Sequence, residues 1–291
     1  MLFNILSGIF YNPVNKGARL KALVRFFKWQ LFYKSFGTSL TIKYLSKSKL
    51  IIHKNFTAST GTYYNGLFEF EIMAFALKFL RKEDLFVDIG ANAGTFTLIG
   101  SNEIGCKTIA FEPNDEAFTM LKNNLRLNNS NVELFNHCVG SQKGLVQFTS
   151  DMGAMNHVLS SKSFNSTEVY IDKIDNICDF DRIALVKIDV EGYELEVIRG
   201  MKESLTNSNV KVVIAEINDQ LEKYGLKKDD IFDEMKNYGF EPYDFDPINS
   251  KLIPIKSCEI EPLNIIFIND LEFVNARIFN SPKIKINNLK L

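Results

Sequence analysis

The stretch that most constrains the fold is FVDIGANAGTFTLIGS, which runs from Phe86 to Ser101. It begins with an apolar run typical of a buried strand, passes through a turn at residues 90–94, and ends in an apolar, Thr-rich segment that predicts a helix. A strand, a glycine-containing turn and a helix in this order form the nucleotide-binding unit of many α/β proteins. The sequence therefore indicates an α/β domain with a nucleotide or nucleoside ligand at this turn.

The residues of the turn argue against a phosphate ligand. In a dinucleotide-binding G-x-G-x-x-G turn the second glycine lets the backbone approach a pyrophosphate, and Asn92 occupies that position here. No lysine follows Gly94, as a P-loop requires, and Asp88 just before the turn would repel a pyrophosphate. S-adenosylmethionine carries an ammonium and a sulfonium but no phosphate, so we expect it as the cofactor.

Glu112 supports the same interpretation. It ends the strand-like run in IAFEPN at 109–114, about twenty residues beyond the glycines, where a carboxylate accepts hydrogen bonds from ribose hydroxyls. The alternative is a glutamate at a solvated strand end or at the start of a helix. DxGxNxG and FEPN at this spacing together favour a nucleoside site.

From Leu85 onward the chain alternates between strand and helix patterns, which predicts a mostly parallel sheet of seven strands with helices on both faces. The last two strands lack a helix between them, so we expect one of them to be antiparallel at the sheet edge. The predicted strands are 85–89, 108–112, 132–137, 183–189, 210–216, 240–245 and 263–268, and the predicted helices are 94–104, 114–127, 191–205 and 227–238. The segment 140–178 interrupts this pattern, as a functional loop would.

The N-terminal part differs in charge from the rest of the chain. Residues 1–68 contain ten Lys or Arg and no Asp or Glu, which leaves 24 basic and 35 acidic residues beyond them, a charge of about −11. This asymmetry indicates an anionic partner such as a membrane surface, or simply lysines that solvate covering helices. We expect no nucleic-acid partner. The predicted organisation is a basic amphipathic extension, 1–60, and a catalytic domain, 61–291.

Within the extension, residues 17–36 predict an amphipathic helix. Packing on the catalytic domain is the slightly favoured interpretation, and peripheral attachment of residues 1–55 to the inner membrane surface is the alternative. Leu20, Leu23, Val24, Phe27 and Leu31 fall on its expected apolar face.

The four cysteines are widely spaced, without a CxxC pair. This pattern indicates neither a disulfide framework nor a zinc site, and it suggests a reducing, cytoplasmic location. The opening MLFNILSGIF lacks the basic leader and cleavage site of a signal peptide.

VDIGANAGTFT, FEPN, the pair Asn156-His157 and KIDVEGYE at 187–194 together resemble the FkbM family of S-adenosylmethionine-dependent methyltransferases over roughly residues 60–270. The resemblance implies a class I, Rossmann-like methyltransferase fold and methyl transfer to a hydroxyl of a sugar or related metabolite. It also implies that Asp88, Gly90, Asn92, Gly94, Glu112 and Asn114 line the cofactor site, and that Tyr64, Gly66 and Glu69 close it from the N-terminal side.

Methyl transfer to a hydroxyl is an in-line displacement that benefits from a general base. The carboxyl ends of the strands offer Asp189 and Glu216 for this role, and Asp189 is the first candidate although it could instead cap the following helix. His157 is the alternative base. Asn156, Lys187 and Glu191 are candidates for substrate binding, although Lys187 could cap a carbonyl and Glu191 could complement a helix dipole. Nothing in the spacing of the acids demands a metal.

Three functions remain in competition. The favoured one is an S-adenosylmethionine-dependent O-methyltransferase that acts on a sugar hydroxyl in a bacterial surface glycan or its precursor, or else on a non-glycan small-molecule hydroxyl. A nicotinamide-dependent oxidoreductase is disfavoured by Asn92. A non-catalytic, membrane-bound module would use residues 1–68 for attachment.

Overall fold

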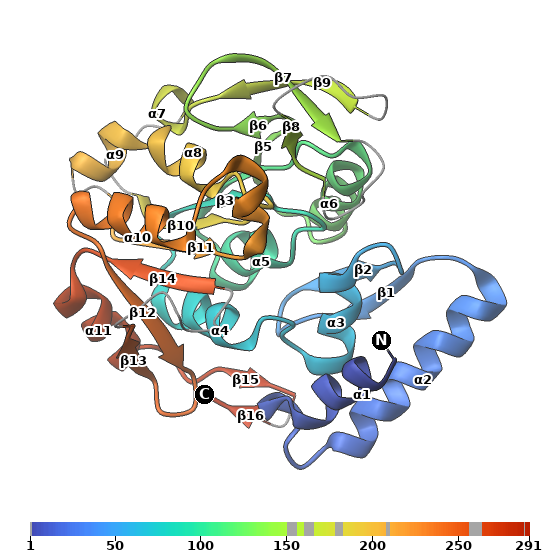
Figure 1. Cartoon of the computed structure of the whole chain (residues 1–291). Coiled ribbons are helices and arrows are strands. Elements are labelled where there is room, and N and C mark those ends of the chain that lie inside the picture. Colours follow the sequence, from blue (N-terminus) through green and yellow to red (C-terminus); the bar gives the residue numbers. More distant parts are fainter. Residues whose placement is uncertain are drawn as a thin grey trace.

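The computed structural model of the chain describes residues 2–149, 156–159, 166–177, 183–207, 210–255, 264–287 and 289–291. A large sheet runs through its middle and helices cover both of its faces (Figure 1). The predicted α/β, class I, Rossmann-like arrangement is therefore confirmed. The eight strands stand in the order β13 (Lys251–Pro254), β12 (Glu241–Asp246), β14 (Asn264–Ile268), β11 (Val212–Glu216), β10 (Ile183–Ile188), β3 (Leu85–Ile89), β4 (Lys107–Phe111) and β5 (Glu133–Phe135).

The strands from β11 to β5 are parallel, but the other end of the sheet differs from the prediction. The antiparallel strand β14 lies inside the sheet between β11 and β12, not at the edge. The edge is an eighth strand, β13, which forms a hairpin with β12. Asp246 holds the hairpin turn, because its carboxylate accepts hydrogen bonds from the backbone N–H groups of Ile248 and Asn249.

Alternation along the strands explains why both faces need helices. In β3, for example, Phe86 belongs to one hydrophobic core, and Leu85 and Val87 belong to the other. The first core packs against α4 (Phe70–Phe79), α5 (Thr95–Leu98), η2 (Ile99–Ile104), α6 (Asp115–Leu127) and α11 (Leu271–Phe279). The second packs against α8 (Glu194–Arg199), α9 (Lys202–Thr206) and α10 (Lys228–Asn237).

Two predicted helices are shorter than expected. The 94–104 segment is α-helical only in α5 and continues as the π-helical turn η2. The 191–205 segment begins at Glu194 and is divided between α8 and α9 near Gly200. Three further short helices are α7 (Ile174–Ile177), η1 (Pro13–Asn15) and η4 (Asp219–Tyr224).

The segment that interrupts the alternation forms a second, four-stranded sheet in its described part. This small sheet stands above α6 and β5 in Figure 1. Its strands follow the order β6 (Cys138–Val139), β9 (Ser166–Asp172), β7 (Gly144–Thr149) and β8 (Val158–Leu159). Cys106 and Cys138 are buried free thiols, whereas Cys178 and Cys258 lie outside the described residues.

The N-terminal extension shares the core of the domain. Ile9, Phe26 and Trp29 are buried in the same hydrophobic cluster as Phe75 and Phe86. None of the helices that the structure describes is both long and apolar enough to cross a bilayer. The extension comprises α1 (Leu2–Tyr11), α2 (Arg19–Phe36), the hairpin of β1 (Leu40–Lys43) and β2 (Lys49–Ile52), and the start of α3 (Thr57–Asn65). A C-terminal hairpin of β15 (Lys285–Ile286) and β16 (Leu289–Lys290) completes the fold.

The face that α2 buries is not the predicted one. Ala22, Phe26 and Trp29 are buried, whereas the side that carries Leu20 and Leu31 is exposed. Aromatic packing on Tyr64 of α3 decides the orientation, since the rings of Phe26 and Tyr64 meet edge to face at 5.3 Å between centroids. Residues 61–65 form the end of α3, and Gly66 follows it.

Candidate active site

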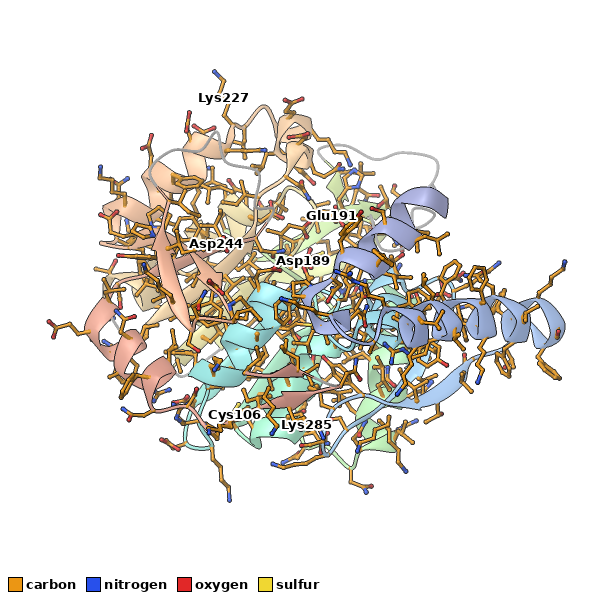
Figure 2. The ribbon with its side chains drawn as sticks, turned by 90° about the horizontal axis from the view of Figure 1, so that it is seen from below. Cys106, Asp189, Glu191, Lys227, Asp244 and Lys285 are labelled. Atoms are coloured by element: carbon orange, nitrogen blue, oxygen red, sulfur yellow. The ribbon has the colours of Figure 1, made fainter. Side chains whose placement is uncertain are left out.

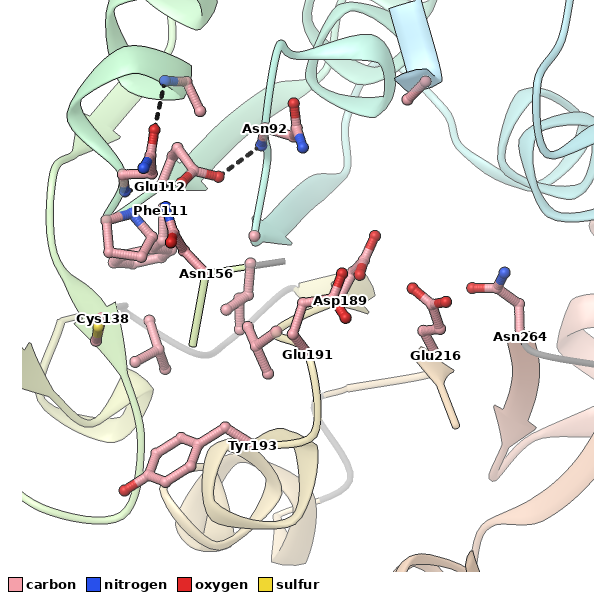
Figure 3. A pocket seen from close by; sticks show the side chains of 18 of the residues that line it. Asn92, Phe111, Glu112, Cys138, Asn156, Asp189, Glu191, Tyr193, Glu216 and Asn264 are labelled. Atoms are coloured by element: carbon pink, nitrogen blue, oxygen red, sulfur yellow. Dashed lines mark hydrogen bonds between the residues drawn. The ribbon is translucent and has the colours of Figure 1, made fainter. Parts of the chain in front are cut away.

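A cavity of about 690 Å³ lies at the edge of the large sheet where its parallel strands end. Gly90 and Asn92 follow β3, Glu112 follows β4, Asp189 follows β10, and Glu216 is the last residue of β11. Figure 3 shows Glu112 and Cys138 at one end of the cavity, Glu216 and Asn264 at the other, and Asp189 between them. This is the position at which open α/β sheets bind ligands.

The structure brings most of the predicted site residues together in this cavity. The lining includes Glu69, Gly90, Asn92, Glu112, Asn114, Asn156, Asp189, Glu191 and Glu216. The lining does not include Tyr64, Gly66, Asp88, Gly94, His157 and Lys187.

Glu112 organises one end of the cavity. Its carboxylate accepts hydrogen bonds from the backbone N–H groups of Asn92 and Asn114, both at 2.8 Å (Figure 3). Each carboxylate oxygen keeps a second acceptor position for a ligand hydroxyl. Burial raises the pKa of Glu112 to about 7. The Asn114 side chain caps α6 by accepting from Ala117 N–H at 2.9 Å.

The two glycines of the turn allow the chain to approach itself. Gly90 has φ +80°, and a Cβ there would lie 1.8 Å from the carbonyl oxygen of Asp189. Gly94 has φ +90°, and a Cβ there would lie 2.5 Å from Leu121. The close approach at these two glycines is made by the end of β10 and by α6. The contact at Gly90 sets Asp189 beside the turn.

Asp88 is not among the residues that line the cavity. Its carboxylate accepts a hydrogen bond of 2.6 Å from the Thr97 hydroxyl at the start of the following helix, and it is paired in register with Lys187 of β10. Burial raises the pKa of Asp88 to about 6. The Thr97 contact joins β3 to α5 and uses only Oδ2, and the expected contact of Asp88 with the cofactor stays a prediction.

Lys187 and Asp189 form an ion pair at the end of β10, with 2.8 Å between Nζ and Oδ2. The Lys187 ammonium also lies 4.8 Å from the centre of the Phe96 ring. Burial acts to lower the pKa of Lys187, but Asp189, Glu69 and Asp88 outweigh it and raise the pKa. Burial acts to raise the pKa of Asp189, and Lys187 outweighs it and lowers the pKa. The pair is therefore ionised at neutral pH.

Glu216 lies beside this pair and is hydrogen-bonded to Asp189. Burial and the Asp189 carboxylate raise the pKa of Glu216 to about 9, so Glu216 keeps its proton at neutral pH and its O–H donates a hydrogen bond to Asp189. On the next strand, Asn264 donates a 3.0 Å hydrogen bond from Nδ2 to Glu69 Oε1. Burial raises the pKa of Glu69.

Glu191 is held in the cavity by a strained backbone. Its φ of +56° is uncommon for a residue other than glycine, and such strain concentrates at functional sites. Burial, with Asp189 nearby, raises the pKa of Glu191 to about 7. Glu194 fixes the loop that carries Glu191, because its carboxylate accepts hydrogen bonds from the N–H groups of Val190 and Gly192.

The Asn156-His157 pair is divided by the fold. Asn156 lines the cavity, whereas His157 is buried outside the lining and is fixed through its backbone to Thr149 of β7. Asn156 also accepts a hydrogen bond of 3.0 Å from the Thr149 hydroxyl. The structure therefore brings Asp189 into the cavity but not His157.

Tyr64 and Gly66 do not close the cavity. Tyr64 packs on Phe26 of α2, and its carbonyl oxygen accepts a hydrogen bond from Arg25. A Cβ on Gly66 would lie 2.7 Å from the side-chain nitrogen of Asn287. Tyr64 thus packs on the extension, and Gly66 lies against the C-terminal hairpin.

Several lining residues were missed in the sequence. His137 and Cys138 follow β5 and so lie at the predicted edge of the sheet, a signal that the strand pattern contained. Asn264 reaches the same edge because β14 runs antiparallel to β11. Among the described residues, no three His, Cys, Asp or Glu side chains are grouped as a metal ion would require. Further lining residues that were not predicted are Phe68, Glu71, Phe148, Tyr193 and Asp244.

Curated relatives match part of the chain. Hexuronic acid methyltransferase AglP of Haloferax volcanii is 30% identical over 148 residues, which are 50% of this chain and 61% of AglP. Methyltransferase 1 of Beauveria bassiana is 28% identical over 149 residues, which are 42% of this chain and 59% of that protein. The chain thus spans about three fifths of the length of these relatives.

Two methyltransferases are among the solved structures that this chain matches. The tRNA (uracil-54, C5)-methyltransferase of Pyrococcus abyssi, solved with S-adenosyl-L-homocysteine, has a TM-score of 0.43 and 11% identity over 79% of this chain and 43% of that chain. A methyltransferase of Pyrococcus furiosus has a TM-score of 0.37 and 16% identity over 85% of this chain and 97% of that chain.

Residues 88–242 match the family described as the methyltransferase FkbM domain, which is the family that the sequence motifs resemble. This match covers more than half of the chain and includes the turn, Glu112, Asp189 and Glu216. The chain therefore belongs to the FkbM methyltransferase family.

Proposed function

We propose that the protein is an S-adenosylmethionine-dependent O-methyltransferase that acts on a sugar hydroxyl in a bacterial surface glycan or its precursor. The observation that carries the proposal is the placement of Glu112 and the Asp189–Lys187 pair at one cavity. Membership of the FkbM family supports methyl transfer, and the relative named as a hexuronic acid methyltransferase supports a sugar acceptor.

The residues of the cavity fit this cofactor. Glu112 has acceptor positions left for ribose hydroxyls, as its two backbone hydrogen bonds occupy one position on each oxygen. The same end is lined by the apolar side chains of Val139, Phe148 and Val158, which suit the faces of a purine. When bound, S-adenosylmethionine supplies the methyl group.

Asp189 is the proposed base. Its carboxylate is the ionised group of the Asp189–Glu216 pair, and 27% of its side chain remains exposed towards the cavity. It accepts a hydrogen bond from the acceptor hydroxyl, holds the oxygen in line, and takes up the proton as the new C–O bond forms. Lys187 holds the Asp189 side chain in place through the 2.8 Å contact.

The charges of the cavity favour an acceptor without a carboxylate. Lys187 is already paired with Asp189, so in the described part of the lining the acidic side chains are not balanced by a free cation. An anionic sugar would be repelled there, whereas a neutral or amino sugar would not. We therefore propose a neutral or amine-bearing acceptor, unlike the hexuronic acid in the relative's name. The acidic lining residues are Glu69, Glu71, Glu112, Asp189, Glu191, Glu216 and Asp244, of which Glu216 is protonated at neutral pH and adds no charge.

Two measurements test the function. Isothermal titration is expected to show binding of S-adenosylhomocysteine and none of NADH. A methyl-transfer screen against nucleotide sugars and purified glycans, read by mass spectrometry, is expected to find a product heavier by one methylene. NADH binding without S-adenosylhomocysteine binding would replace the proposal with an oxidoreductase.

A further inference from the structure

The outer side of α2 carries an exposed row of apolar side chains. We call Leu20, Val24, Phe27 and Leu31 the α2 stripe; their exposed fractions are 75%, 43%, 53% and 67%. Their spacing places them on one side of the helix, opposite the buried Trp29. Four exposed apolar side chains along one side of a helix indicate an interaction site, because exposed apolar patches of this kind mark such sites.

Neighbouring elements extend this surface. Ile5, Phe10 and Tyr11 of α1 are exposed as well, and the Arg19 guanidinium lies 4.6 Å from the centre of the Phe10 ring. This contact joins the end of α1 to the start of α2. Figures 1 and 2 show α2 along the outside of the molecule, with its far end projecting beyond the other elements.

The charges around the α2 stripe have one sign. Lys21 and Lys28 flank it on one side and Lys34 on the other, and all three are exposed. Residues 1–68 contain no acidic residue, whereas the rest of the chain is acidic. The surface therefore combines an apolar row with a positive border.

We propose that the α2 stripe and its lysines dock on the surface of an anionic phospholipid bilayer. A helix of this kind lies in the plane of the interface, with apolar side chains among the acyl chains and lysines at the lipid phosphates. A second copy of the chain fits less well, since a two-fold contact would bring the lysines of both copies together.

Docking in this way would hold the cavity close to the bilayer. α2 packs against α3, and Thr57 and Ala58 of α3 line the cavity. An acceptor attached to a lipid would reach the cavity without leaving the membrane surface. The docking itself does not depend on the acceptor or on catalysis.

Co-sedimentation of the full chain with vesicles tests the proposal. Partitioning onto vesicles of phosphatidylglycerol and phosphatidylethanolamine is expected to exceed partitioning onto phosphatidylcholine by at least about tenfold, and to weaken at about 0.5 M salt. The variant L20S/F27S/L31S and the variant K21E/K28E/K34E are each expected to lose most of this binding.

Matched variants elsewhere on the surface serve as controls. L145S/I248S/F279S removes equally exposed apolar groups, and K202E/K236E/K283E reverses three exposed lysines. Both are expected to bind as the wild type does. Because the residues of the stripe are exposed, unchanged thermal unfolding will show that its variants fold.

Three outcomes would overturn the proposal. They are equal binding to both kinds of vesicle, equal losses in the control and stripe variants, and a dimer in light scattering that becomes a monomer only in L20S/F27S/L31S. The last result would assign the surface to a second copy of the chain.

Discussion

The Lys187 ammonium lies 2.8 Å from Asp189 Oδ2, two residues further along β10, and only 3% of the lysine side chain is exposed. The lysine side chain is therefore buried, whereas the aspartate lines the cavity. Glu216 adds a proton-bearing carboxyl to the same group. Among these three side chains Asp189 is the ionised carboxylate, and Lys187 compensates its charge from the protein side.

Lys187→Met is expected to destabilise the protein. It leaves the partly buried Asp189 carboxylate without its partner, which raises the Asp189 pKa and lowers the free energy of unfolding by about 2–3 kcal/mol at neutral pH. Urea unfolding measures this loss. The double variant Lys187→Met with Asp189→Asn removes both charges and is expected to recover most of it; no recovery would show that packing on Phe96 dominates.

Asp189→Asn is expected to lower kcat at least about 100-fold, since the acceptor hydroxyl loses its base, and to leave S-adenosylhomocysteine affinity within about threefold. His157→Gln is the comparison, and we expect its kcat to stay within about threefold of wild type because His157 lies outside the cavity lining. The reverse pattern in steady-state kinetics would assign the base to His157.

Glu112→Gln is expected to weaken S-adenosylhomocysteine binding at least about tenfold in isothermal titration. A glutamine has only one acceptor oxygen in its side chain. Either the Asn92 or the Asn114 N–H therefore loses its hydrogen-bond partner, and the side-chain oxygen that would accept from the ribose hydroxyls is displaced. Asp115→Asn removes a charge three residues away on the exposed start of α6. Equal losses in the two variants would attribute the effect to charge alone.

The stability of the protein is expected to fall as the pH rises from about 6 to about 9. Burial and Asp189 raise the pKa of Glu216 from its ordinary 4.5 to about 9, so the folded state binds this proton more tightly than the unfolded state does. The resulting stability is complete below about pH 4.5 and is lost as the pH rises through about 9.

Glu216→Gln should therefore show a smaller fall in unfolding temperature between these two pH values. Glu241→Gln, at the exposed start of β12, is the control and should follow the wild type. A fall in Glu216→Gln as steep as in the wild type would place the responsible proton on another carboxyl.

A neutral or amino sugar is expected to exceed the matching hexuronic acid in kcat/KM by at least about tenfold, because the carboxylates of the cavity repel an anion. Asp244→Asn should narrow this ratio, since Asp244 lines the cavity. Asp233→Asn, on the exposed side of α10, should not. A preference for the hexuronic acid in the wild type would refute the charge argument.

Much of this architecture could be predicted because it depends on local pattern. Strand and helix alternation placed all seven predicted strands within a few residues of their observed bounds. The cavity followed from the parallel direction of β3, β4, β10 and β11, whose last residues must meet at one edge. By contrast, β13 depends on a turn held by Asp246, which the apolar pattern does not reveal.

The sequence by itself determined the family, the α/β alternation and the carboxylates at the strand ends, since each depends on residues close together along the chain. Only the tertiary structure decided which side of α2 is buried, because Phe26 and Trp29 are as apolar as Phe27 and Leu31 and only their partners distinguish them. The tertiary structure likewise decided the charge states of two carboxyls. Asp189 is ionised and Glu216 is protonated because of their burial and their distances to Lys187, and the local sequence encodes neither quantity.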